Sequence, residues 1–410
     1  MQIAIIGMGP AGVSVVKTLR ENGCDDPITL FSAEKVPPYS PPALGDYLIT
    51  GRQETLFWQG RNFCDKYSVT CRSGERIIRI FPQENKILTD KNKIFGYDRL
   101  VIASGSSLYA PVKGSDKKGI LNFKTLDGAD RIKHMAMQDG KSAIIVGGGF
   151  IGVEIALCLA KIGIRPAVLN RRGWIMPRLL DTETAAYVEK DLRTRGVDVM
   201  LNTDAVAFFG DEQVKGLVTA HGKELTADIY IAATGVRPNI DFIRDTDIEH
   251  KDGIIVNKYL QTCYPDIYAC GDVAETIDFI SGERKIHGLY PVAVDHGRTV
   301  AWNLMGKRLA YGPQISLNSL KELGFKIMVA GRPDGEQLKY RTSDTLRKLY
   351  ITDGRITGFV LLGDISNAGV YLSLMYKKTD VSGMKTELVL PGFTMARFAA
   401  GQPFRISGKL

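Results

Sequence analysis

The sequence lacks the features of a membrane-spanning protein and of a protein held together by metal ions or disulfides. No apolar run approaches the roughly 18 to 20 residues that a membrane-spanning helix requires. The five histidines form no HExxH motif and no close pair, so we expect no metal site. Six cysteines lie scattered without a CxxC pair, which predicts reduced thiols rather than a disulfide framework or a zinc site: Cys24, Cys64, Cys71, Cys158, Cys263 and Cys270.

The chain also lacks a concentration of charge. Lys and Arg number 53 against 45 for Asp and Glu, a formal net charge of +8, yet no block of five or more basic residues occurs. An ordinary solvated surface and an acidic protein partner are both compatible with this balance. Because no helix-turn-helix, zinc-finger or basic-stripe pattern is present, we expect no nucleic-acid binding.

Length and composition predict a globular chain of several domains. The 410 residues exceed one ordinary domain, since about 150 residues per domain predicts two or three. The chain is 44% hydrophobic and 24% charged, which excludes disorder and coiled coil. An apolar run begins at once with Gln2 to Ile6, so we expect no signal peptide. With the scattered cysteines, this predicts a cytoplasmic protein.

Two segments repeat one glycine-rich pattern 140 positions apart. In each, a short β-rich run leads into a GxGxxG turn and a helical stretch, and another strand follows, at Ile28 to Phe31 and at Ala167 to Leu169. This order predicts two βαβ units of the dinucleotide-binding type. The turn residues expected to contact cofactor are Gly7, Gly9, Pro10, Ala11 and Gly12 in the first segment, and Gly147, Gly149, Phe150, Ile151 and Gly152 in the second.

Each glycine of such a turn has a separate role. The first permits a tight turn, the second lets the backbone approach a pyrophosphate, and the third allows the helix to pack on its strand. The phosphates then lie at the helix N-terminus, where free N–H groups and the helix dipole favour anions. One GxGxxG turn is weak evidence, whereas two turns that each join a strand to a helix favour two dinucleotide sites.

Three shorter motifs end other strands. The small-residue turn Ala103-Ser104-Gly105 ends one strand, and Thr234-Gly235 ends a second. Asp272 follows Gly271 directly after a third strand. Each motif alone also fits an ordinary strand end, but their order along the chain is informative.

The order of these five motifs resembles that of the FAD-dependent pyridine nucleotide-disulfide oxidoreductase superfamily, over about residues 1 to 330. The resemblance implies an α/β fold with two Rossmann-like domains and a C-terminal α/β interface domain. It implies a discontinuous FAD domain at 1–112 and 242–318, an NAD(P) domain at 113–241, and the interface domain with its tail at 319–410. It also assigns the first glycine turn to FAD, the second to NAD(P)H, and Asp272 to the ribityl chain of the flavin.

The resemblance implies further contacts near the flavin ring. Tyr290, Pro291 and Val292 begin a helix that points at the pyrimidine end of the isoalloxazine, where its dipole stabilises negative charge on the reduced flavin. His296 either belongs to this site or lies on the helix surface. Cys270 is expected to be a small buried residue in place of alanine.

The segment from Val36 to Asp46 holds no cysteine, so we expect no thiol relay beside the flavin. Its Tyr-x-x-Pro-x-Leu pattern resembles the ferredoxin and rubredoxin reductases of the superfamily. Those relatives usually carry a lysine where Asp46 stands and an arginine where Pro41 stands, and their lysine pairs with the acid that corresponds to Glu154. Either Asp46 and Glu154 both face the flavin, which raises one of their pKa values, or Asp46 points elsewhere. In the second case, Glu154 forms an ion pair with another cation or lies on the surface of its helix.

The residue that ends the second strand of each βαβ unit bears on cofactor choice. An acid there hydrogen-bonds a ribose hydroxyl, and Glu34 is the nearest acid in the first unit. In the second unit the position holds Asn170, followed by Arg171 and Arg172. Two adjacent guanidinium groups can bind a 2′-phosphate, which favours NADPH. Alternatively, both arginines are solvated on a loop and bind no phosphate. The sequence leaves open whether the cofactor is NADH or NADPH.

The C-terminal part predicts a small α/β unit. Strands are expected at Leu346–Tyr350 and Ile356–Leu362, joined by the hairpin turn Asp353-Gly354, with a helix from Asn367 to Met375. This arrangement is similar to the interface domain of the same superfamily. The tail from Pro391 to Leu410 is either a docking arm or a loose terminus.

These features favour an oxidoreductase that transfers electrons between NAD(P)H and a one-electron carrier, namely ferredoxin, rubredoxin or an iron–sulfur subunit. Flavin takes a hydride and releases electrons singly, which suits a thiol-free enzyme to such partners. The stretch from Leu361 to Val370 and the variant Tyr39-Ser40-Pro41-Pro42 are similar to flavin subunits of anaerobic aldehyde or 2-oxoacid oxidoreductases. The protein then acts alone, as a homodimer or within a larger complex.

Two alternatives remain open. The first is an NAD(P)H oxidase that reduces oxygen at the flavin, and the second is a flavoprotein that senses redox state and regulates a partner. The sequence leaves the electron acceptor, the physiological direction and the oligomeric state undetermined.

Overall fold

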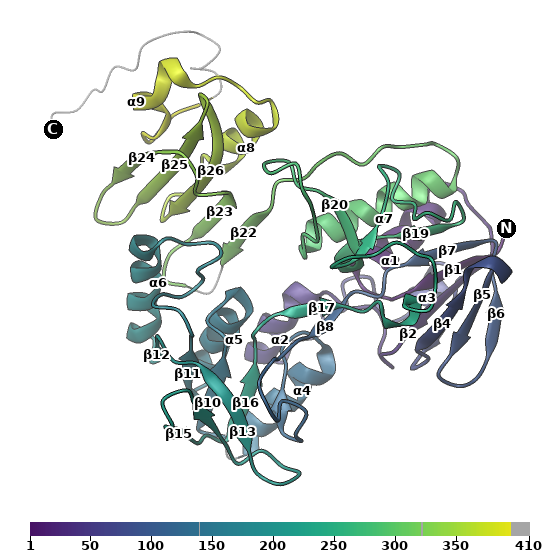
Figure 1. The fold of residues 1–410 in the computed structure, drawn as a ribbon, viewed down its shortest axis with the longest axis horizontal. Helices are drawn as coiled ribbons and strands as arrows, with labels where there is room; N and C mark the ends of the chain where they lie inside the picture. The colour runs from purple at the N-terminus through teal and green to yellow at the C-terminus, as the bar shows by residue number, and fades with distance from the viewer. Residues whose placement is uncertain (139, 321–322, 395–410) are drawn as a thin grey trace.

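Two parallel sheets and one antiparallel sheet form the frame of the computed structural model, which describes residues 1–138, 140–320 and 323–394. Figure 1 shows the first parallel sheet near the N-terminus, the second at the other end of the molecule, and the antiparallel sheet stacked on the second. The mixed α/β class and the two Rossmann-like units expected from the sequence are confirmed.

The first parallel sheet has the strand order β19-β7-β1-β2-β3. A segment far along the chain therefore returns to pair with an early strand. The strands are β1 (Ile3–Ile6), β2 (Ile28–Ser32), β3 (Thr70–Ser73), β7 (Arg99–Ile102) and β19 (Ile267–Ala269). Helix α1 (Pro10–Glu21) connects β1 to β2, and α7 (Tyr290–Leu304) packs along α1. Every residue of β1 is buried, as expected for a parallel strand covered on both faces.

The second parallel sheet repeats this plan with the order β12-β11-β10-β16-β9. Helix α5 (Phe150–Lys161) connects β10 to β11, which pair in parallel, so both predicted βαβ units are confirmed. Helices α4 (Leu126–Gln138) and α6 (Thr182–Thr194) complete this part. The strands are β9 (Ile120–Leu121), β10 (Ser142–Val146), β11 (Arg165–Leu169), β12 (Asp198–Met200) and β16 (Ile229–Ala232).

Smaller elements surround and connect the two parallel sheets. An antiparallel pair, β8 (Ser106–Leu108) and β17 (Val236–Pro238), runs between them, as Figure 1 shows. Helices α2 (Leu44–Thr50) and α3 (Phe63–Lys66) follow β2. Three small sheets contain β4 (Ile77–Phe81), β5 (Lys86–Thr89) and β6 (Ile94–Gly96); β13 (Ala205–Phe209), β14 (Gly216–Thr219) and β15 (Glu224–Leu225); and β18 (Ile254–Ile255), β20 (Ala274–Ile277) and β21 (Arg284–Lys285).

The C-terminal sheet is antiparallel, with the order β22-β23-β26-β25-β24. Asp353 and Gly354 both have positive φ, +50° and +70°, and join β25 to β26 as the two-residue turn predicted from the sequence. The predicted helix is α8 (Ala368–Tyr376), and residues 395–410 of the tail lie outside the described part. The other elements are β22 (Leu317–Leu320), β23 (Ile327–Gly331), β24 (Glu336–Arg341), β25 (Leu346–Thr352), β26 (Arg355–Leu362) and α9 (Lys385–Leu388).

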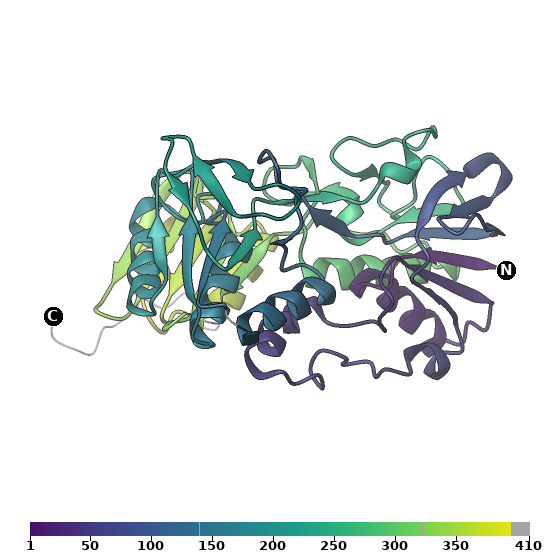
Figure 2. The same cartoon turned by 90° about the horizontal axis from the view of Figure 1, so that it is seen from below.

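The C-terminal sheet and the second parallel sheet share one hydrophobic core. Leu323 and Val329 are buried together with Val188 of α6 and Leu157 of α5. Figure 2 shows these two sheets together at one end, with the first parallel sheet at the other. Among the described residues, no helix combines the length and the apolar character needed to cross a membrane.

The prediction that all cysteines are reduced is wrong for one pair. Cys64 and Cys71 form a disulfide, with their Cα atoms 6.0 Å apart. The chain turns back between α3 and β3, which brings two residues seven positions apart into bonding range. No CxxC spacing marks this pair in the sequence, because the bond depends on how the chain turns back. Within the described residues, Cys24, Cys158, Cys263 and Cys270 form no disulfide.

Candidate functional site

The first glycine turn is formed by close backbone packing. Gly7 has φ +115°, and a Cβ there would overlap the carbonyl oxygen of Ala103. A Cβ on Gly12 would overlap the carbonyl of Gly7. At Gly9, by contrast, a Cβ would meet no atom within 4 Å. Two glycines are thus needed to bring β1, β7 and α1 together, while Gly9 leaves open space over the start of the helix.

The second glycine turn has the same geometry. Gly147 has φ +118° and lies against the carbonyl of Ala233, a Cβ on Gly152 would overlap the Gly147 carbonyl, and Gly149 faces open space. The small-residue turns after β7 and β16 therefore lie directly on the two glycine turns, Ala103 on Gly7 and Ala233 on Gly147. The structure thus brings these separately predicted motifs together.

Both helix starts fit a dinucleotide pyrophosphate. Gly9 caps α1 and Gly149 caps α5, and neither N-cap donates or accepts a side-chain hydrogen bond. The first turns of α1 and α5 contain no acidic residue. Free N–H groups, the positive end of the helix dipole and an open approach at the second glycine together suit an anionic ligand.

Glu34 lies just beyond β2, where the sequence predicts a ribose contact. Its carboxylate accepts a hydrogen bond from the Tyr39 hydroxyl, with an O···O distance of 3.0 Å, and the same hydroxyl accepts one from the Leu126 backbone N–H at 3.1 Å. Burial raises the pKa of Glu34 above its usual value. The carboxylate is thus held in place by the chain itself.

Asp272 lies after β19, at the edge of the first sheet that faces β8. Its Oδ2 accepts hydrogen bonds from Ser106 Oγ at 2.6 Å and from Lys124 Nζ at 3.2 Å. Lys124 precedes α4 and is 148 positions from Asp272. Sequence reasoning missed Lys124, because no motif distinguishes one lysine in a connecting segment.

The start of α7 lies close to Asp272. Tyr290, Pro291 and Val292 form its first turn, which contains no acidic residue, and the N-cap Leu289 leaves the N–H groups without a side-chain acceptor. Tyr290 packs edge-on against Trp58, with ring centroids 6.4 Å apart. Trp58 lies in the loop after α2, and no motif in the sequence marks it as part of the site. His296 is 1% exposed, so its assignment to the helix surface is wrong.

Glu154 and Asp46 have different surroundings. Asp46 is exposed on α2, which favours the alternative in which its side chain points elsewhere. Glu154 on α5 is partly buried, and its Oε1 lies 3.9 Å from the position that a Cβ on Gly45 would occupy. The neighbour of Glu154 on α2 is therefore Gly45, and the reading of Glu154 as a surface acid is not supported.

Asn170 organises the loop after β11. It is 8% exposed, and its Nδ2 donates to the carbonyl oxygens of Arg172 at 3.1 Å and Trp174 at 2.6 Å. The side chain packs against Gly148 in the second glycine turn. Arg171 and Arg172 are exposed on the same loop. The structure thus places both arginines on the loop that borders the glycine turn.

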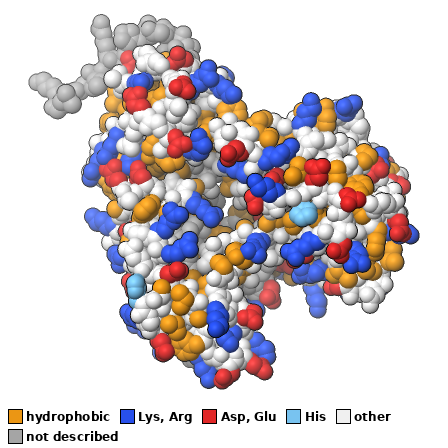
Figure 3. All heavy atoms as spheres, viewed as in Figure 1, with side chains coloured by type: hydrophobic (Ala, Val, Ile, Leu, Met, Phe, Trp, Pro, Cys, Tyr) orange, Lys and Arg blue, Asp and Glu red, His pale blue; other side chains and the backbone are white. Residues whose placement is uncertain are grey.

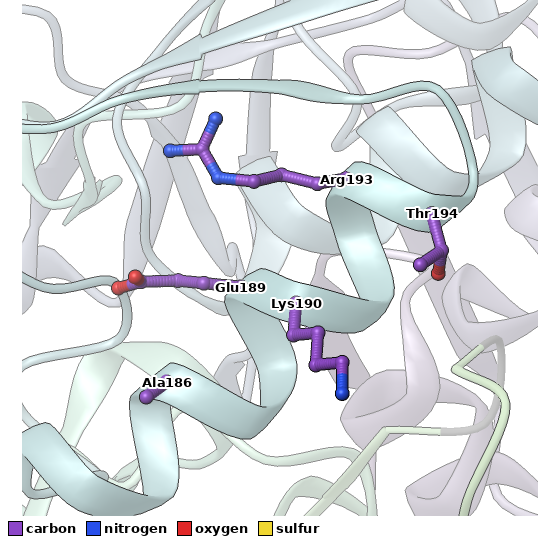
Figure 4. A pocket seen from close by; sticks show the side chains of 5 residues that line it. All are labelled: Ala186, Glu189, Lys190, Arg193 and Thr194. Atoms are coloured by element: carbon purple, nitrogen blue, oxygen red, sulfur yellow. The ribbon is translucent and has the colours of Figure 1, made fainter.

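A surface hollow of about 490 Å³ lies away from these features, on α6. Figure 4 shows that its side chains all leave this one helix: Ala186, Glu189, Lys190, Arg193 and Thr194. Glu189 accepts a hydrogen bond from the Ile175 N–H, and Arg193 donates to the Val199 carbonyl. Glu189 thus ties α6 to the loop after β11, and Arg193 ties it to β12. Within the described chain, no cluster of three or more His, Cys, Asp or Glu residues has the arrangement of a metal site.

Comparison with known proteins places the chain among oxidoreductases. The family described as pyridine nucleotide-disulphide oxidoreductase matches residues 1–297. The chain is 27% identical over 400 residues to the assimilatory nitrate reductase electron transfer subunit of Bacillus subtilis (strain 168), which covers 95% of this chain and 51% of that protein. It is 32% identical over 327 residues to an NADH oxidase of Methanocaldococcus jannaschii. That alignment covers 77% of this chain and 72% of the oxidase.

Two further matches extend over nearly the whole chain. One is the epsilon subunit of an NADH-dependent phenylglyoxylate dehydrogenase from Aromatoleum evansii, 24% identical over 98% of this chain and 97% of that protein. The other is a covalent putidaredoxin reductase–putidaredoxin complex, with a TM-score of 0.88, 21% identity and 98% of each chain covered. The chain nevertheless spans only about half the length of the Bacillus subtilis relative. Taken with the two matching glycine turns, the family match shows that the chain belongs to the pyridine nucleotide-disulphide oxidoreductases, FAD-dependent enzymes that use NADH or NADPH.

Proposed function

We propose that this protein is a flavoprotein reductase that transfers electrons between NAD(P)H and an iron–sulfur carrier or an iron–sulfur subunit. The observation that carries the proposal is that, among the described residues, neither the segment 36–46 nor the turn at Gly271 offers a usable thiol. The segment 36–46 has no cysteine, and burial raises the pKa of Cys270, the thiol next to Gly271, to about 12. A thiol with this pKa is protonated at neutral pH and is a poor nucleophile.

The Cys64–Cys71 disulfide does not change this conclusion. Cys71 lies on β3, at one edge of the first sheet, whereas Asp272 follows β19 at the opposite edge. Four strand spacings separate these edges, roughly 19 Å at the usual distance between strands. Direct exchange between this disulfide and a group beside Asp272 is therefore not expected.

Each part of the site has a proposed role. When bound, FAD supplies the chemistry that accepts a hydride from nicotinamide and passes electrons on singly. The first glycine turn and Glu34 hold its adenosine diphosphate part, and Asp272 holds the ribityl chain. The N–H groups of Tyr290 and Val292, at the start of α7, favour negative charge at the pyrimidine edge. The second glycine turn holds the nicotinamide cofactor, and Glu154, on the helix that follows this turn, is the acid proposed to face the flavin.

The proposed division into domains follows from these roles. We assign residues 1–112 and 242–318 to FAD, 113–241 to NAD(P)H, and 319–410 to the interface domain. β19 and α7 pack into the first sheet although they follow the second sheet in the sequence, which supports a discontinuous FAD domain.

We favour an electron-transfer subunit of a larger complex over an independent enzyme. The epsilon subunit named for a phenylglyoxylate dehydrogenase matches this chain almost end to end, and phenylglyoxylate is a 2-oxoacid. The Bacillus subtilis relative is also named as an electron transfer subunit. The proposed partner is thus a subunit that carries iron–sulfur clusters, and a homodimer is the proposed state in its absence. The proposed location is the cytoplasm, where a disulfide such as Cys64–Cys71 is uncommon.

Arg171 and Arg172 favour NADPH over NADH. Asn170 hydrogen-bonds the loop instead of presenting an acid to the ribose, so no negative charge repels a 2′-phosphate there. Two guanidinium groups on the exposed loop can then bind that phosphate.

An NAD(P)H oxidase is the second candidate, because a Methanocaldococcus jannaschii NADH oxidase is 32% identical to this chain. An anaerobic stopped-flow experiment separates the two candidates. FAD-loaded protein is reduced with NADH or NADPH and mixed either with an oxidised ferredoxin or with air-saturated buffer. Rapid reoxidation by ferredoxin with slow reaction in air is the expected result. Rapid reoxidation in air alone would overturn the proposal in favour of the oxidase.

A further inference from the structure

A buried hydrogen bond joins α7 to the turn that carries Asp272. The backbone N–H of Gly271 donates to Nδ1 of His296, with an N···N distance of 3.1 Å. His296 lies in the second turn of α7 and is 1% exposed. The contact therefore reaches from the helix interior to the residue immediately before Asp272.

The geometry fixes the protonation state of the imidazole. Because Nδ1 accepts the Gly271 proton, it carries no proton itself, and the ring proton is on Nε2. Nε2 is buried and has no hydrogen-bond partner among the described residues. The ring packs edge-on against Tyr311, with centroids 4.4 Å apart. Burial lowers the pKa of His296 to about 3, so the ring is neutral at neutral pH.

The Gly271 backbone has little freedom to adopt another position. Its φ is +76°, a value that favours glycine, and a Cβ there would lie 3.1 Å from Cβ of Ala11 and 3.7 Å from Cβ of Ala293. The turn is thus held between the start of α1 and the first turn of α7. The His296 bond is the polar contact that sets its register against α7.

We propose that His296 is a positioning residue for FAD: its Nδ1 holds the Gly271–Asp272 turn so that the Asp272 carboxylate is aimed at the flavin before the flavin binds. The inference rests on the proposed function, in which Asp272 binds the ribityl chain. It adds a residue on α7 that acts through Asp272 without itself touching the cofactor. A preorganised acceptor lowers the ordering cost of binding, so the effect should appear in FAD affinity.

Three substitutions at this position separate hydrogen bonding from packing. His296→Asn places an amide oxygen where Nδ1 stands, His296→Gln displaces the polar group by one bond, and His296→Leu fills the space without an acceptor. The FAD dissociation constant of each apoprotein is measured by flavin fluorescence quenching, with apoprotein melting as a check on folding. Arg298→Gln, on the exposed face of the same helix, is the control.

We expect His296→Leu and His296→Gln to weaken FAD binding about tenfold, the effect of one lost buried hydrogen bond. His296→Asn should stay within about threefold of the wild type, and Arg298→Gln should not change affinity. If His296→Leu does not fold, the difference in FAD affinity between His296→Gln and His296→Asn decides the test. Unchanged FAD affinity in both His296→Leu and His296→Gln, or equal losses in all three variants, would overturn the inference.

A double-mutant cycle tests whether His296 acts through Asp272. In an Asp272→Asn background, His296→Leu should cost less than about threefold in FAD affinity, because the carboxylate to be aimed is gone. The same tenfold loss in both backgrounds would show a packing role only and would overturn the inference. Asp272→Asn alone reports on the proposed function: if it leaves FAD binding unchanged, the role of Asp272 fails, whatever the His296 variants show.

Discussion

The ammonium group of Lys348 lies 2.6 Å from Oδ2 of Asp181, across the junction between the C-terminal sheet and the second parallel sheet. Lys348 is on β25 and is 1% exposed, and its Nζ is also 2.8 Å from Oε2 of Glu183. Asp181 is at the same time the N-cap of α6, where it accepts a hydrogen bond from the Thr184 N–H at 2.8 Å. One buried cation therefore ties the C-terminal sheet to the start of a helix that packs with the second parallel sheet.

Lys348→Met should loosen this junction. The substitution leaves two carboxylates without their shared cation, and because both remain partly exposed we expect about 2 kcal/mol of lost unfolding free energy, below the value for a fully buried pair. Urea unfolding monitored by tryptophan fluorescence measures the loss. Lys190→Met, an exposed lysine on α6, should change the unfolding free energy by less than about 0.5 kcal/mol. Equal effects of the two substitutions would contradict this role for Lys348.

The same junction should make stability depend on acid pH. Hydrogen bonds from Lys339 and Lys348 hold the pKa of Glu183 below its usual value. A carboxyl with a depressed folded-state pKa stabilises the fold fully above its unfolded pKa, about 4.3, and loses this contribution as pH falls through the folded pKa. Melting temperatures between pH 7 and pH 3 should therefore fall more steeply for the wild type than for Lys348→Met. If the melting temperatures of the two proteins fall equally with pH, the contact between Lys348 and Glu183 does not cause the pH dependence.

Gly9 and Gly149 offer matched tests of the two dinucleotide sites. Both have an extended backbone that valine can adopt, and both face open space, so Gly9→Val and Gly149→Val should fold normally. Gly9→Val should weaken FAD binding at least tenfold, because the side chain blocks the approach of the pyrophosphate. Gly149→Val should retain FAD and raise the KM for NAD(P)H at least tenfold. FAD content and steady-state kinetics check both variants. If Gly9→Val raises the KM for NAD(P)H and Gly149→Val loses FAD, the assignment of the two turns to their cofactors is reversed.

Arg171→Glu should weaken NADPH more than NADH. An acid on the exposed loop repels the 2′-phosphate and has no such group to repel in NADH, so we expect at least a tenfold greater loss in kcat/KM for NADPH. Arg178→Glu, an exposed arginine further along the chain, should affect both cofactors alike. Equal losses for NADPH and NADH in Arg171→Glu would discard the idea that this arginine binds the phosphate.

The Cys64–Cys71 disulfide should matter for stability and not for turnover. Joining residues seven positions apart closes a short loop, so the double substitution Cys64→Ser and Cys71→Ser should cost about 2 kcal/mol of unfolding free energy. Electron transfer to ferredoxin should remain within about twofold of the wild type. A large loss of turnover at normal FAD content would show that this disulfide takes part in the reaction.

The sequence predicted those parts of the site that depend on local backbone constraints. Gly7 and Gly147 must adopt positive φ and touch a neighbouring strand, and few residues other than glycine can do so, which makes the pattern readable. The Asp353-Gly354 hairpin was predictable for the same reason. The βαβ units followed because the strand, turn and helix lie within a few tens of residues.

Only the tertiary structure decided which distant side chains meet. Lys124 and Asp272 are 148 positions apart, and Lys348 and Asp181 are 167 apart, so their pairing depends on how whole sheets assemble. The burial of His296 also depends on tertiary structure. It follows from the packing of α7 on α1 and on the Gly271 turn, and the residues next to His296 in the sequence do not indicate this packing. The sequence by itself determined the two glycine turns and the lack of a cysteine at 36–46, because residue type alone fixes them. The pairs that surround those turns required the assembled fold, since each is a contact between surfaces formed by separate elements.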